Sequence, residues 1–226
     1  METPRILILR FKDILHKDEV GLFRGAVLNK IKENSDVLFH NHTEDGFRYA
    51  YPLIQYKRIN QKAAIICLNQ GVDVIGKVFS AAGNELNIGN RTIQLEIDSV
   101  QPSQFRIQVW DQLTTYQIRK WLPLNQKNLE QYNMLPGIGS KYEFLEKILT
   151  GNILSCAKGL GIHFDKKITC HITQADEPYI VKYKGVSFIS FDLQFKSNVS
   201  LPNYIGLGKG SSLNHGTIVR IKRLTF

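Results

Sequence analysis

Residues 5–12 have the sequence Arg-Ile-Leu-Ile-Leu-Arg-Phe-Lys, an apolar run of β-forming residues that predicts a strand. Downstream, apolar residues recur from Val20 to Ile31 at spacings of three or four, which is the period of one helix face. Asp18 stands just before this segment and is a residue type that caps helix N-termini. The chain is therefore predicted to open with a strand followed by an amphipathic helix.

The same two periods alternate through the rest of the first half. After a predicted loop at Ser35–Gly46, we predict strands at Phe47–Tyr56 and Lys62–Leu68, a helix at Gln70–Ala81 and two short strands within Glu85–Asp98. The resulting order, β-α-β-β-α-β, is that of the ferredoxin-like fold.

The second half is less regular but also mixes strands with helix. Ser140-Lys-Tyr-Glu143 matches a capping box and predicts the start of a helix that continues through Ile153. Strands are predicted as a pair around Asp111-Gln112 within Gln104–Leu122, and at Lys167–Thr173, Tyr179–Tyr183, Val186–Phe195 and Thr217–Arg223. We therefore predict an α+β chain of two small domains, residues 1–122 and residues 123–226.

The charge balance of the chain indicates what kind of partner it binds. Its 226 residues include 29 Lys and Arg against 20 Asp and Glu, a net charge of +9, with 43% hydrophobic and 22% charged residues. This composition is that of a globular protein and excludes a disordered, collagen-like or coiled-coil chain. Residues 123–226 hold 13 basic and 7 acidic residues, a balance of +6, and the last acidic residue is Asp192. So strong a balance indicates a polyanionic partner, either nucleic acid or an anionic membrane.

Targeting signals and cysteine pattern point to the compartment. No apolar run approaches the roughly 18 residues that span a bilayer, and the N-terminus lacks the basic start and cleavage site of a signal peptide. Cys67, Cys156 and Cys170 are odd in number and show no CxxC spacing, which predicts neither a disulfide framework nor a zinc ribbon. We expect a cytoplasmic, reduced protein with cysteines in its core.

A glycine-rich stretch, Gly206-Leu-Gly-Lys-Gly-Ser-Ser-Leu-Asn-His-Gly216, lies in the part of the chain that has no acidic residue. Glycines and serines expose backbone N–H groups and allow close approach, which suits phosphate oxygens. The stretch is neither a Walker A loop nor a Rossmann fingerprint, because a strand-like segment rather than a helix follows it. A flexible hairpin loop is the alternative, but the basic surroundings favour a polyanion site.

This arrangement resembles the CRISPR repeat-processing endoribonucleases, the "Cas six" family of the RAMP superfamily. The resemblance rests on a Gly-hydrophobic-Gly loop placed just before the last strand, and on the opening strand and helix. It implies two tandem ferredoxin-like, RRM-like domains and metal-free cleavage of precursor CRISPR RNA without a cofactor. Residues 98–158 carry no motif that matches, and Asn214-His215-Gly216 stands where the family often has a second Gly-x-Gly.

Two histidines, His40 and His42, lie in the predicted loop between the first helix and the second strand. On an extended backbone their side chains project to one side, about 6–7 Å apart. An imidazole, with an ordinary pKa of about 6.5, can act as the base for a ribose 2′-hydroxyl or as the acid for the leaving 5′-oxygen. The resemblance, especially to the archaeal-type branch, implies that His40 and His42 are catalytic and that Tyr49 and Lys32 accompany them.

Other interpretations of the histidines stay open. The pair could ligate a metal, but no third ligand with suitable spacing is evident, and Cys170-His171 is a lone pair. It could also be an exposed polar loop without function. His16, His163 and His171 have no comparable context and are expected to be structural.

Residues of the basic C-terminal region are predicted to contact RNA, and His215 is expected to touch RNA rather than to catalyse. The predicted RNA-binding set is Gly206, Gly208, Lys209, Gly210, Ser211, Ser212, His215, Gly216, Arg220 and Lys222. Lys182, Lys184 and Lys196 are further candidates for phosphate contact. Aromatic residues elsewhere in strands are expected to pack in the core.

The leading hypothesis is a metal-independent endoribonuclease that leaves a 2′,3′-cyclic phosphate and a 5′-hydroxyl, with either histidine as the base. The alternative is a non-catalytic RNA-binding RAMP subunit of a CRISPR effector complex. In both hypotheses the partner is CRISPR repeat RNA. Both also allow contact with other subunits of a CRISPR effector complex and formation of a homodimer. A membrane partner is disfavoured because the helix predicted over residues 140–157 has balanced rather than basic charge.

Overall fold

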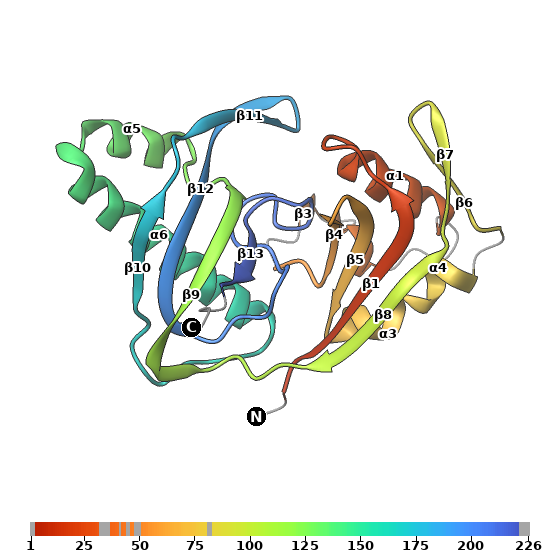
Figure 1. The fold of residues 1–226 in the computed structure, drawn as a ribbon, viewed down its shortest axis with the longest axis horizontal. Coiled ribbons are helices and arrows are strands. Elements are labelled where there is room, and N and C mark those ends of the chain that lie inside the picture. Colours follow the sequence, from red (N-terminus) through yellow and green to blue (C-terminus); the bar gives the residue numbers. More distant parts are fainter. Residues whose placement is uncertain are drawn as a thin grey trace, which may run out of the picture. The chain divides into compact units, whose positions relative to one another are not determined.

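The computed structural model describes residues 3–31, 37–40, 42–43, 46–47, 51–80 and 83–221. The chain divides into two compact units (Figure 1). Unit 1 comprises Met1–Phe105 together with Ser212–Asn214, and unit 2 comprises Arg106–Ser211 together with His215–Phe226. The sequence places the boundary after Leu122 instead. The difference is strand β9 (Val109–Trp121), which lies inside the sheet of unit 2.

Unit 1 has the ferredoxin-like topology that the sequence predicts. Its sheet has the order β4-β5-β1-β8 with antiparallel neighbours, so the first and third strands of the β-α-β-β-α-β series are central. The elements of this series are β1 (Arg5–Ile14), α1 (Val20–Lys30), β4 (Ile54–Ile59), β5 (Lys62–Leu68), α3 (Gln70–Val74), α4 (Gly76–Ser80) and β8 (Ile97–Gln104). Short additions are α2 (Val37–His40), β2 (His42–Thr43), β3 (Gly46–Phe47), β6 (Glu85–Ile88) and β7 (Arg91–Gln94).

The core of unit 1 forms between α1 and alternate residues of the sheet. Phe23 of α1 is fully buried and makes edge contacts with Phe11 of β1 and Tyr56 of β4, at centroid distances of 6.0 and 5.9 Å. The predicted helix face is confirmed. The N-cap residue of α1 is Glu19 rather than the predicted Asp18, and its side chain makes no capping hydrogen bond.

Three predictions for unit 1 differ from the structure. The second strand begins at Ile54, because Pro52, just before it, has no N–H to donate to a ladder. The helix predicted at 70–81 is broken at Ile75, where Val78 N bonds Ile75 O in a tight turn. The strands β6 and β7 form a separate hairpin, and β8 is the fourth strand of the main sheet.

Unit 2 repeats this strand order with one helix replaced. Its sheet has the order β10-β12-β9-β13, and β11 pairs with β12. The elements are β9, α5 (Gln126–Met134), α6 (Gly137–Gly159), β10 (Cys170–Ala175), β11 (Tyr179–Tyr183), β12 (Val186–Val199) and β13 (Thr217–Arg220). Residues 200–216, all described, contain no helix, so the glycine-rich stretch connects the third and fourth strands of this series. The tandem ferredoxin-like, α+β fold is thus the fold of this chain.

The core of unit 2 lies between α6 and the sheet. Helix α6 buries Leu149 and Ile153 completely, and Tyr116 of β9 stacks on Phe195 of β12 at a centroid distance of 5.5 Å. Cys67, Cys156 and Cys170 are buried free thiols, as predicted. In the described part of the chain no helix is both long and apolar enough to cross a bilayer.

Three predictions for unit 2 also differ. Strand β9 runs without interruption through Asp111-Gln112. Helix α6 begins at Gly137 behind Pro136, with no side-chain cap, so the capping box at Ser140 is wrong. Helix α5 was not predicted, because none of its residues is buried and its sequence therefore carries no apolar face.

Candidate functional site

The predicted catalytic histidines lie at the end of a short helix and at the start of a short strand. Helix α2 ends at His40, and β2 begins at His42, which pairs with Phe47 of β3. The neighbouring Phe39 is buried in the core of unit 1, so the segment is attached to that core. Because His40 ends a helix, the alternation expected of an extended backbone does not apply to this pair. Lys32 and Tyr49 lie outside the described residues.

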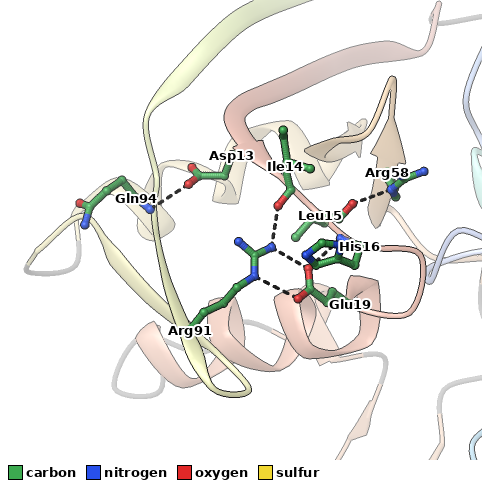
Figure 2. Close-up of polar contacts among 8 residues, drawn as sticks. All are labelled: Asp13, Ile14, Leu15, His16, Glu19, Arg58, Arg91 and Gln94. Carbon is green, nitrogen blue, oxygen red and sulfur yellow. Dashed lines mark hydrogen bonds and ion pairs between the residues drawn. The ribbon is translucent and has the colours of Figure 1, made fainter.

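Helix α1, which precedes this segment in the chain, is fixed at both ends, and Figure 2 shows the contacts at its start. At its start, Arg91 of β7 donates to both carboxylate oxygens of Glu19, from Nε at 3.0 Å and from Nη2 at 2.6 Å, and also to Ile14 O at 2.6 Å. This pairing lowers the pKa of Glu19 to about 2. At its end, Lys30 donates to the carbonyl of Gly83.

The edge strand of unit 1 is completed by three residues from the C-terminal region. Tyr56 N donates to Ser212 O at 2.8 Å, and Arg58 N donates to Asn214 Oδ1 at 3.3 Å. Leu213 pairs in parallel with Tyr56 and packs on the unit 1 core. Ser212, predicted to contact RNA, thus uses its carbonyl as part of the sheet.

Lys57 lies between Tyr56 and Arg58 on β4 and is not among the site residues that the sequence predicts. It is fully buried, and desolvation lowers its pKa to about 7. The available signal was the sequence Ile54-Gln-Tyr-Lys-Arg-Ile59, in which a lysine occurs in a segment that is otherwise buried. The strand predicted at 47–56 stopped one residue short of it.

The glycine-rich stretch is hydrogen-bonded into the sheet of unit 2. Gly206 pairs with Thr217, Leu207 N donates to Gly216 O at 2.8 Å, and Gly216 N donates to Lys120 O at 3.0 Å. Leu207 is fully buried. The base of the loop is therefore anchored, unlike the flexible hairpin loop that the sequence also allowed.

Two of its glycines are required by space as well as by conformation. A Cβ on Gly216, where φ is +59°, would lie 2.0 Å from Leu207 O. A Cβ on Gly208, where φ is +78°, would lie 2.6 Å from Asn152 Oδ1, which accepts a hydrogen bond from Trp121 Nε1 at 2.9 Å. These positions admit only glycine without local rearrangement.

Burial separates the predicted RNA contacts into two groups. Gly206, Ser211 and Gly216 are buried and shape the loop, whereas Lys209 and Arg220 are exposed. Gly208, Gly210, Ser212 and His215 are half-buried, and Lys222 lies outside the described residues. A ligand of unit 2 can therefore reach Lys209 and Arg220 most directly.

Asp192, the last acidic residue of the sequence, is engaged by hydrogen bonds within unit 2. Asp192 Oδ1 accepts from Lys120 N at 2.6 Å and from the Tyr179 hydroxyl at 2.9 Å. Beyond Asp192 the sequence has only basic charge, which leaves the surface of this region attractive to anions. Within the described residues, no group of three or more His, Cys, Asp or Glu is placed to hold a metal ion.

Comparison with known proteins gives consistent matches over both units. Residues 3–106 match the model of the Cas6b N-terminal domain, and residues 108–221 match that of the Cas6b C-terminal domain. The protein MJ0978 of Methanocaldococcus jannaschii is 40% identical over 105 residues, which are 46% of this chain and 70% of that protein.

Two solved structures extend the likeness to nearly the whole chain. A crystal structure of Cas6b, 28% identical, covers 97% of this chain and 100% of its own with a TM-score of 0.88. A crystal structure of the CRISPR RNA processing endoribonuclease Cas6b is 25% identical, with the same coverage and a TM-score of 0.73.

Proposed function

This chain belongs to the Cas6b family, and on that premise we propose that it is an endoribonuclease that cleaves precursor CRISPR RNA within the repeat. Support comes from the match of both domain models and from the similarity to a structure titled as a CRISPR RNA processing endoribonuclease. The observation that carries the proposal is the position of His40 and His42 at the junction of α2 and β2, next to the core residue Phe39.

The proposed reaction needs only side chains of this protein. One imidazole of the pair removes the proton of a ribose 2′-hydroxyl, and the resulting alkoxide attacks the adjacent phosphorus. The bond from phosphorus to the 5′-oxygen breaks, and the other imidazole protonates that oxygen. The products are a 2′,3′-cyclic phosphate and a 5′-hydroxyl. Lys32 and Tyr49 stabilise the extra negative charge of the pentacoordinate phosphorus.

Unit 2 is proposed to supply contacts to the RNA backbone. Lys209 and Arg220 are exposed, and Gly208 and Gly216 fit against Asn152 and Leu207, which fixes the loop that carries Lys209. Because these contacts are electrostatic, they bind RNA without regard to base identity.

The test is cleavage of labelled repeat RNA by the purified protein in EDTA. We expect cleavage without metal, with ends that carry a 2′,3′-cyclic phosphate, and no cleavage of RNA with a 2′-deoxy nucleotide at the cut site. A requirement for added Mg²⁺ would contradict the mechanism. Absence of cleavage with tight binding under all conditions would favour the non-catalytic RNA-binding subunit.

A further inference from the structure

The hairpin of β11 and β12 presents two aromatic rings on one face. Its turn is Lys184-Gly185, with φ values of +51° and +82°. In its antiparallel register Val181 pairs with Phe188 and Tyr183 pairs with Val186, and cross-strand partners share a face. Tyr183 and Phe188 therefore lie together, in edge contact at a centroid distance of 6.2 Å. Both rings are half-buried, so part of each is open to solvent.

The glycine-rich loop contributes two more groups to the same face. The His215 ring meets the Tyr183 ring at 5.2 Å and 81°. The Lys209 ammonium lies over the Phe188 ring, 4.7 Å from its centroid, and Lys184 Nζ lies 6.0 Å from the centroid of Tyr183. Two segments separated by some twenty residues of sequence thus form one aromatic and basic surface within unit 2.

The part of the chain that forms this surface is predominantly basic. Between Pro178 and the C-terminus the sequence has seven Lys and Arg and one acidic residue, Asp192, whose carboxylate is already engaged by Lys120 N and the Tyr179 hydroxyl. An anionic ligand with a flat apolar ring complements both properties, because the ring stacks and the anion meets the lysines. A nucleotide of single-stranded RNA has this chemistry, whereas bases paired in a stem have their faces covered by their neighbours.

We propose that Tyr183, Phe188, Lys209 and His215 form a nucleotide subsite in which one unpaired base of the repeat RNA stacks on an aromatic ring while its phosphate meets Lys209. The subsite rests on the proposed function, since it presumes that the chain binds repeat RNA. It adds to that function a position at which the RNA must be single-stranded.

The experiment measures the affinity of the full-length protein for a repeat RNA made uncleavable by a 2′-deoxy nucleotide, with single abasic nucleotides scanned along it. In the wild type we expect one abasic position to weaken binding by about 5- to 100-fold, the range expected for loss of one stacked base. In a Tyr183→Leu, Phe188→Leu double variant the same abasic position should cost nothing further. Tyr183→Phe keeps the ring and should retain the sensitivity.

A matched control exists in the same unit. Tyr132 also carries an ammonium over its ring, that of Lys141 at 5.0 Å, and also makes an edge contact with a phenylalanine, Phe191, at 5.9 Å. Tyr132→Leu and Lys141→Gln should leave RNA affinity within about twofold, whereas Lys209→Gln should lower it severalfold. Equal effects at the two sites would overturn the subsite.

Other outcomes separate this proposal from the function on which it rests. If the wild type binds no repeat RNA, the proposed function fails. If it binds and cleaves but no abasic position depends on Tyr183 and Phe188, the subsite alone fails. Should the leucine variants not fold, 2-aminopurine placed at each position of the RNA decides the matter in the wild type. The subsite is supported if the fluorescence is quenched at one position, if Tyr183→Phe leaves that quenching unchanged and if Lys209→Gln reduces it. Absence of quenching at every position contradicts the subsite.

Discussion

Arg91 holds Glu19 by two charged hydrogen bonds and at the same time bonds the carbonyl of Ile14, so one guanidinium joins β7 to the end of β1 and the start of α1 (Figure 2). The Glu19 side chain is 15% exposed, less than any other carboxylate in an ion pair among the described residues of unit 1, so solvent screens this pair less. The junction between the end of β1 and the start of α1 therefore depends on an ionised carboxylate.

Stability at low pH should report on this carboxylate. Because the folded state lowers the pKa of Glu19 from 4.5 to about 2, its contribution is complete above pH 4.5 and is lost as the pH falls toward 2. Glu19→Gln should lower the free energy of unfolding at pH 7 by roughly 1–3 kcal/mol and flatten its dependence on pH below 4.5. Denaturant unfolding between pH 2 and 7 measures both effects.

The control is Asp73→Asn, which removes a pair with Arg5 whose side chains are 52% and 49% exposed. It should change the free energy of unfolding far less than Glu19→Gln does, because solvent screens an exposed pair. An equal loss in the two variants would show that the Arg91 junction has no special weight.

Lys57 should make stability depend on pH in the neutral to alkaline range. The folded state lowers its pKa from 10.5 to about 7, so between these values the unfolded chain binds the extra proton and stability rises with pH. From pH 7 to pH 9 the free energy of unfolding of the wild type should rise by about 1–2 kcal/mol more than that of Lys57→Met. The exposed Lys17→Met should retain the wild-type slope.

Glycine positions in unit 2 should differ sharply in their tolerance of alanine. Gly216→Ala places a methyl group 2.0 Å from Leu207 O at φ +59°, and should cost about 2–4 kcal/mol with a parallel loss of RNA affinity. Gly139→Ala, in the first turn of α6 with nothing within 4 Å, should stabilise by about 0.5–1 kcal/mol. Thermal unfolding and RNA binding of the two variants, compared side by side, test this; a neutral Gly216→Ala would mean that the loop can rearrange.

The histidines should affect cleavage without affecting binding. His40→Ala and His42→Ala should each lower the single-turnover rate by about 100-fold or more, because general acid or base catalysis is lost, while the affinity for RNA stays within about twofold. His163→Ala, an exposed histidine of unit 2, is the control and should cleave at the wild-type rate. Loss of RNA binding in the His40 and His42 variants would contradict their proposed role.

How well the sequence predicted the fold depended on burial. Strand β5, which is almost entirely buried, matches its predicted bounds, and β1 is extended by two residues. Strand β11 also matches its predicted bounds, although none of its residues is buried. Helix α5 escaped prediction because it buries no residue, and β9 was divided because its exposed Asp111-Gln112 looks like a turn. Both errors lie in segments without buried residues, where the pattern of polar and apolar residues does not distinguish helix, strand and turn.

The candidate site was only partly accessible from sequence. The glycine-rich loop could be located by composition, but not the reason for each glycine, since Asn152 and Leu207 crowd Gly208 and Gly216 only in the folded chain. The contacts of Lys209 and His215 with the β11–β12 hairpin join residues far apart in sequence, and no local pattern announces them. Lys57 was missed because burial of a lysine is a tertiary property.

Ser212–Asn214 supply acceptors for the outer edge of β4, so unit 1 is not contiguous in the gene product. A fragment that ends at Phe105 would leave the amides of Tyr56 and Arg58 as an unprotected template on which a foreign strand could dock, the usual origin of sheet-to-sheet aggregation. Proteolytic nicking or premature termination late in translation would therefore compromise the first half of this protein as well as the last.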